Sequence, residues 1–74
     1  MTFLEAFAGV SAMKSYRFFY PDQFTPDWRS EPVQAANERE ALRLLCEQAN
    51  MKLEPVVQLR NLQVMQNGVW VWVL

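Results

Sequence analysis

The sequence of 74 residues has no histidine and only two glycines. Histidine is the commonest general base and metal ligand among side chains, and a phosphate-cradling loop of the usual kind needs several glycines. The carboxylates Asp22, Asp27 and Glu31 do not follow the spacing of a calcium loop, and Pro26 interrupts them. We therefore expect a protein that is not an enzyme and that holds no metal and no cofactor.

Cysteine is also scarce, because Cys46 is the only one. A lone cysteine cannot form an internal disulfide, which is typical of a reducing cytosol. The start of the chain lacks the basic residues of a secretory signal, and no apolar run approaches the length of a membrane span. We expect a cytoplasmic protein that does not enter a membrane, in which Cys46 fills a small space in the core.

Neither charge is in excess, since seven basic residues oppose eight acidic ones. Nucleic acids and anionic membranes select for clustered Lys and Arg, so this balance argues against either as a partner. What the chain has instead is apolar, with 51% hydrophobic and 14% aromatic residues. This content favours one compact domain over residues 1–74.

The strongest structural pattern is Asn67-Gly68 between two apolar runs at the end of the chain. Both residue types accept the positive φ of a type I′ turn, so the pattern predicts a β-hairpin. Alternation then places Trp70 and Trp72 on one face and valines on the other, and we expect both apolar faces to be covered. The predicted pairs are Gln66 with Val69, Met65 with Trp70, Val64 with Val71, Gln63 with Trp72, and Leu62 with Val73.

Aromatic residues recur at alternate positions in residues 15–20, and this pattern predicts a strand that ends before Pro21. We expect three of its aromatic residues to face the core and two other side chains to lie on the tryptophan side. The three are Tyr16, Phe18 and Tyr20, and the two are Arg17 and Phe19.

A short strand is expected over residues 32–36, directly before the main helix. Asn37 and Glu40 form a capping-box pattern, and the helix should run to about Asn50. Its buried stripe is expected to consist of Ala41, Leu42, Leu45 and Ala49.

Two further segments complete the expected fold. Residues 56–65 predict the strand on which the hairpin returns, with a break near Arg60 and Asn61 where the alternation changes phase. Residues 2–12 carry a second capping-box pattern and predict a short amphipathic helix. The alternative is that residues 1–12 are a dispensable extension, because Met13 could be a second translation start.

Together these elements predict an α+β fold in the order α-β-β-α-β-β. About four strands form a small antiparallel sheet that ends in the Asn-Gly hairpin. The main helix is expected on the valine face of this sheet.

The stretch between Pro21 and Pro32 is rich in turn-forming residues and is expected to be a long loop. Trp and Arg are enriched at binding hot spots, so this loop and the tryptophan face together form the candidate partner-binding site. The alternative is that the aromatic loop residues fold back as a lid over the core. The candidate residues are Phe19, Phe24, Asp27, Trp28, Arg29, Trp70 and Trp72.

The sequence thus favours a small protein-binding module that acts stoichiometrically. Small cytosolic chains without motifs are often accessory proteins of phages and other mobile elements that inhibit a host protein, as anti-CRISPR inhibitors do. A single-stranded nucleic-acid binder that stacks bases on an aromatic sheet face is one alternative, although Arg17 and Arg60 are the only cations expected near that face. A structural role is another alternative. In it, either the N-terminal helix covers the tryptophan face, or two copies cover each other's tryptophan faces as a structural homodimer.

Overall fold

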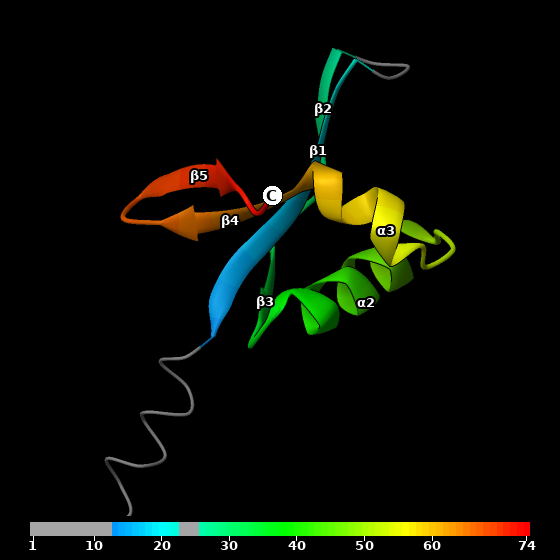
Figure 1. Cartoon of the computed structure of the whole chain (residues 1–74), viewed down its shortest axis with the longest axis horizontal. Coiled ribbons are helices and arrows are strands. Elements are labelled where there is room, and N and C mark those ends of the chain that lie inside the picture. Colours follow the sequence, from blue (N-terminus) through cyan, green and yellow to red (C-terminus); the bar gives the residue numbers. More distant parts are fainter. Residues whose placement is uncertain (1–12, 23–25) are drawn as a thin grey trace, which may run out of the picture.

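The structure is a computed structural model that describes residues 13–22 and 26–74. Its five strands form one antiparallel sheet in the order β2-β1-β4-β5, with β3 also paired to β1 (Figure 1). The α+β class is confirmed, and the predicted helix over residues 2–12 lies outside the described residues. The elements are β1 (Lys14–Asp22), β2 (Pro26–Arg29), β3 (Val33–Ala35), α2 (Glu38–Ala49), α3 (Pro55–Gln58), the 3-10 turn η1 (Leu59–Asn61), β4 (Leu62–Gln66) and β5 (Val69–Trp72).

The hairpin of β4 and β5 has the predicted turn and register. Asn67 and Gly68 have φ of 51° and 82°, the left-handed backbone that a type I′ turn requires. The pairs from Gln66 with Val69 to Gln63 with Trp72 are all observed, and Val73 donates to the carbonyl of Leu62 at 3.0 Å.

The predicted loop between Pro21 and Pro32 is wrong, because it contains β2. This strand forms a hairpin with the outer half of β1, where Tyr20 lies opposite Trp28 and Phe19 opposite Arg29. The strand order in the described part is therefore β-β-β before the main helix, and the sheet has five strands instead of about four.

A one-residue bulge joins β2 to β3 along the same edge of β1. Between the pairs Phe19–Arg29 and Tyr16–Val33, β1 has two residues and the facing segment has three, Ser30 to Pro32. Ser30 bridges the irregular segment, since its hydroxyl accepts from the Phe18 N–H at 2.8 Å and its own N–H donates to the Phe18 carbonyl at 3.0 Å. The extra residue lets both Trp28 and Val33 lie on the side of the sheet that faces the helix.

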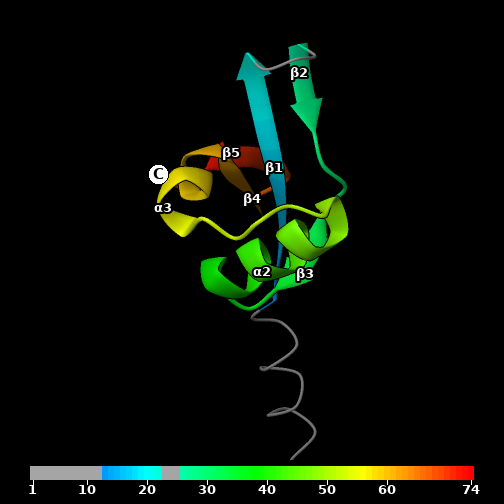
Figure 2. The ribbon, with the colours of Figure 1, turned by 90° about the vertical axis from the view of Figure 1, so that its right-hand side faces the viewer.

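Helix α2 lies against β3 and β1, and Figure 1 shows the helices and the β4–β5 hairpin on opposite sides of β1. In Figure 2 the helices lie in front of β1. We call the helix-covered side of the sheet the core face. Its buried residues are Tyr16, Phe18, Val33, Ala35, Leu62 and Val64, and they pack with Ala41, Leu42, Leu45 and Cys46 of α2. Val71 and Val73 pack against this cluster, as predicted for the valine face.

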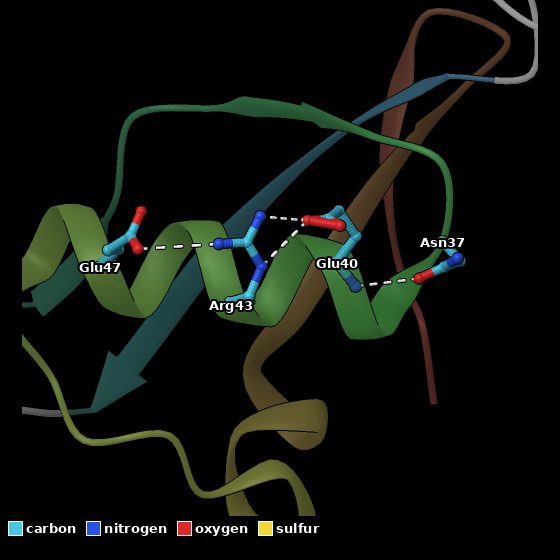
Figure 3. Close-up of polar contacts among 4 residues, drawn as sticks. All are labelled: Asn37, Glu40, Arg43 and Glu47. Carbon is cyan, nitrogen blue, oxygen red and sulfur yellow. Dashed lines mark hydrogen bonds and ion pairs between the residues drawn. The ribbon is translucent and has the colours of Figure 1, made fainter.

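The predicted ends of α2 are confirmed. The Asn37 side chain accepts from the Glu40 N–H at 2.9 Å (Figure 3). Asn50 ends the helix in the left-handed conformation. The Glu40 carboxylate binds Arg43, which also lies 3.7 Å from Glu47. Cys46 is buried as predicted, whereas the prediction for Ala49 is wrong because it is exposed beyond the stripe.

The predicted strand over residues 56–65 is correct only from Leu62 onward. Residues 55–61 form α3 and η1, because Pro55 occupies the first helical position, where its fixed φ suits a helix and its missing N–H costs nothing. Gln58 holds this turn, accepting from the Glu54 N–H and donating to the Lys52 carbonyl, both at 2.7 Å. The order of the described elements is therefore β-β-β-α-α-β-β.

Candidate functional site

The side of the sheet opposite the helices carries aromatic rings and two guanidinium groups. We call this side the open face. Its residues follow from alternation and from the observed pairs, in which Phe19 faces Arg29, Arg17 faces Gln63, and Gln63 also faces Trp72. They are Arg17, Phe19, Arg29, Gln63, Met65, Trp70 and Trp72.

The rings and guanidinium groups of the open face form one connected row across the strands. The guanidinium carbon of Arg17 lies 4.4 Å from the ring centre of Trp70 and 5.4 Å from that of Phe19. Arg29 approaches the same Phe19 ring at 5.5 Å, and the ring of Trp72 meets it edge-on at 5.8 Å. Each cation over a ring contributes about 0.5–2 kcal/mol, depending on its exposure, so the row is held in a defined arrangement.

Gln63 fixes the position of Arg17 within this row. It is buried, and its side-chain oxygen accepts from the Arg17 Nε at 2.8 Å. Partial burial, and to a lesser extent the charge of Arg29, lowers the pKa of the Arg17 guanidinium below its usual value. The hydrogen bond to Gln63 therefore orients the Arg17 guanidinium, which has less freedom than that of an ordinary surface arginine.

Within residues 13–21 and 27–74, neither arginine forms an ion pair with a carboxylate. The ion pairs of this part join Arg43 to Glu40 and Glu47 on α2, away from the sheet. Arg29 is exposed, and Trp72 retains 45% of its accessible surface. The open face thus combines apolar area with positive charge.

The structure splits the predicted site into two. Phe19, Arg29, Trp70 and Trp72 lie together on the open face, which confirms the predicted side of β1. Trp28 lies on the core face instead, with its ring centre 5.5 Å from that of Tyr20. The prediction that this tryptophan shares a surface with the other two is wrong, because neighbouring residues of a strand point to opposite faces.

Trp28 borders a shallow groove of about 280 Å³ between β2 and the C-terminal half of α2. The remaining lining comes from Arg29, Ser30, Glu31, Leu45, Gln48 and Ala49. Trp28 lies against Tyr20, which packs on the core, and Trp28 is itself 38% exposed. The alternative in which aromatic residues of this segment cover the core therefore describes Trp28 in part.

Two candidate residues remain, Asp27 and Phe24. Asp27 is exposed within β2 and has a φ of 59°, the left-handed conformation that Asp tolerates better than most residues. Phe24 lies outside the described residues, so its predicted role stays a prediction.

The sequence did not predict that Gln63 binds Arg17 or that Arg29 lies against Phe19. The predicted pair of Gln63 with Trp72 puts Gln63 on the tryptophan side. Its hydrogen bond to Arg17 depends on the pairing of β1 with β4, which no local sequence pattern indicates. Arg29 joins Phe19 only because β2 is a strand. Arg60, expected as the second cation near this face, lies in η1 instead of the sheet.

Among residues 13–22 and 26–74, His, Cys, Asp and Glu side chains form no group of three that could hold a metal ion. The helices of this same part are too short and too polar for any of them to cross a membrane.

Comparisons of the chain with protein-family models, with curated proteins and with solved structures found no match.

Proposed function

We propose that the chain is a small protein-binding module that acts stoichiometrically, without catalysis, and binds its partner through the open face. The observation that carries this proposal is the row of Arg29, Phe19, Arg17 and Trp70 across the strands. Aromatic residues and Arg are the types enriched at interface hot spots, and here they are pre-arranged on a rigid sheet.

The composition of the open face also suggests the chemistry of the partner. Arg17 and Arg29 form no ion pair within residues 13–21 and 27–74, and both flank the ring of Phe19. A protein surface that offers an apolar centre with carboxylates beside it would cover the rings and pair the arginines. We therefore propose an acidic, partly apolar protein surface as the partner.

A homodimer in which two open faces stack is less favourable. It would place Arg17 and Arg29 of one copy against the same arginines of the other, without carboxylates from the described part to separate them. Like charges brought together in a desolvated interface cost several kcal/mol.

A single-stranded nucleic acid is the second candidate, because rings on a sheet can stack bases and two arginines lie among them. Two cations are few for a groove that follows a phosphate backbone. A gel shift with a labelled mixed-sequence single strand distinguishes the two. We expect no shift at low salt, whereas a salt-sensitive shift that Arg29→Glu abolishes would replace the protein proposal.

The protein proposal is tested by comparative capture from lysate of the cells that carry the gene. Immobilised wild type should retain a specific protein, and Arg29→Glu or Trp72→Ala should each reduce its retention about tenfold or more, the loss expected for hot-spot residues. Arg39→Glu is the matched control, since it makes the same charge change at an exposed position of α2.

Arg29 also lines the groove beside α2, so Trp72→Ala separates the two sites. Retention by Trp72→Ala, with loss in Trp28→Ala, would contradict the proposal and move the site to that groove. Circular dichroism of each variant shows that the fold is intact. If the captured protein loses its own activity when bound, the proposal extends to an inhibitor of the kind that phages and mobile elements encode.

A further inference from the structure

The two edges of the sheet differ sharply in how they are protected against pairing with another strand. The edge formed by β2 and β3 begins at a proline, contains Asp27 at positive φ, and is interrupted by the bulge with Glu31 and Pro32. Proline, charge and bulges are the devices by which natural sheets prevent edge-to-edge association. This edge therefore carries several of them within ten residues.

The opposite edge, β5, carries none of these devices. From Asn61 to Leu74 the sequence has no charged residue and no proline. The register of β4 with β5 is unbroken from Gln66–Val69 to Gln63–Trp72, so no bulge distorts the edge. Within the described part, β5 pairs only with β4.

The hairpin register shows which backbone groups of β5 have no partner within residues 13–22 and 26–74. Val73 donates to Leu62, so Val73, Val71 and Val69 direct their N–H and C=O groups toward β4. Trp70 and Trp72 consequently direct theirs away from the sheet. This is a short row of donors and acceptors at an apolar edge, with Val69 57% and Trp72 45% exposed.

We propose that the β5 edge pairs with β5 of a second copy of the chain. The pairing would be antiparallel about a two-fold axis, which joins the two sheets into one. An uncharged strand has no charges that would select a different protein as its partner. Its row of backbone donors and acceptors is complementary to the same row of a second copy related by a two-fold axis.

The position of the charges favours a second copy at the edge over a second copy on the face. Arg17 and Arg29 lie on β1 and β2, and β4 separates both strands from β5. Edge pairing therefore keeps the arginines of the two copies apart and leaves both open faces free. It places the tryptophans of the two β5 strands side by side as cross-strand neighbours.

The first test measures the mass of the full chain by light scattering from micromolar to millimolar concentration, together with amide hydrogen exchange by NMR. We expect a mass that rises toward twice 8.7 kDa, and amides of Trp70 and Trp72 that become protected as the dimer forms. The amide of Val71, which faces β4, is the internal reference and should be protected at every concentration.

Two variants separate backbone pairing from side-chain contact. Trp72→Pro removes an outward N–H and keeps the inward ladder, whereas Trp72→Val removes the indole and keeps the N–H. We expect Trp72→Pro to weaken the dimer about tenfold or more beyond Trp72→Val, because each copy loses a hydrogen bond. If Trp72→Pro does not fold, the wild-type exchange measurement decides the question alone.

Three results would overturn the proposal. The first is a monomer at all concentrations with rapid exchange of Trp70 and Trp72. The second is a dimer in which these two amides stay unprotected, which would assign self-association to another surface. The third is a monomer in which they are protected at every concentration. A chain that begins at Met13 would then show whether the preceding residues cover the edge.

Discussion

At the scale of single residues, Tyr16 ties the sheet to the main helix. Its ring is 1% exposed in the core, and its hydroxyl donates to the Glu38 carboxylate at 3.1 Å, in the first turn of α2. Burial, followed by the charge of Glu38 and this hydrogen bond, raises the pKa of Tyr16 to about 12 from 10.0.

This raised pKa predicts how stability changes at alkaline pH. Between pH 10 and pH 12 the unfolded chain releases the Tyr16 proton while the folded chain keeps it, so the unfolded state binds fewer protons. The free energy of unfolding is therefore unaffected by this group below pH 10 and falls by about 2 kcal/mol as the pH rises through 12. Urea unfolding at a series of pH values measures the slope.

Tyr16→Phe is the variant that isolates this effect. It should be less stable at neutral pH by about 1 kcal/mol, the contribution of a typical hydrogen bond, and its stability should fall less between pH 10 and pH 12. Part of the slope remains, because burial also raises the pKa of Tyr20. An equally steep decline in Tyr16→Phe would show that Tyr16 is not responsible.

At the scale of elements, the bulge between β2 and β3 depends on one hydroxyl. Phe18 is fully buried, and its N–H donates to the Ser30 hydroxyl where the regular ladder is interrupted. Ser30→Ala leaves that N–H without this partner and should lower the free energy of unfolding by about 1–3 kcal/mol.

Ser30→Thr keeps the oxygen and is the control, for which we expect a much smaller loss in the same thermal or urea unfolding measurement. Equal stability of wild type and Ser30→Ala would mean that water or a backbone shift satisfies Phe18, and that the bulge does not need the hydroxyl.

Elements specified by neighbouring residues could be predicted from the sequence. The hairpin register follows from Asn67-Gly68 and alternation, and the start of α2 follows from Asn37 and Glu40, whose contacts all lie within a few residues. Such local signals act whatever the rest of the chain does.

Two elements were predicted wrongly, one because of a distant contact and one because of local contacts that the alternation concealed. The segment containing β2 has turn-forming residues and becomes a strand because β1 supplies a paired edge. The segment from Pro55 has alternating apolar residues and becomes a helical turn, in which Val56 is 80% exposed and Gln58 binds Lys52 and Glu54. Tertiary pairing overrides the turn-forming composition of the first segment, whereas local contacts override the β-propensity of the second.

In the candidate site, too, local patterns could be predicted from the sequence and distant strand pairings could not. Alternation within β1 and β5 was enough to place Phe19 with Trp70 and Trp72. The sequence could not predict that Trp28 and Arg29 lie on opposite faces, because their positions depend on the formation of β2 and on its register with β1. The hydrogen bond between Arg17 and Gln63, which are 46 residues apart in the chain, requires the pairing of β1 with β4.

At the scale of the whole molecule, each surface of the sheet has a separate role in our account. The core face packs against α2, whereas we propose binding for the open face and self-association for the uncharged β5 edge. The open face and the β5 edge share Trp70 and Trp72 but use different groups, since the face uses their rings and the edge their backbone. Arg29→Glu should therefore disrupt binding and leave dimerisation unchanged, because Arg29 lies on β2, at the other end of the sheet from β5.

The measurement that tests the central claim most directly is an NMR titration of the full chain with the captured protein, followed through the indole N–H signals of the three tryptophans. The chain concentration is held constant so that self-association does not change. We predict that the signals of Trp70 and Trp72 shift or broaden while that of Trp28 does not. A response confined to Trp28, or none at all in a confirmed complex, would contradict binding through the open face.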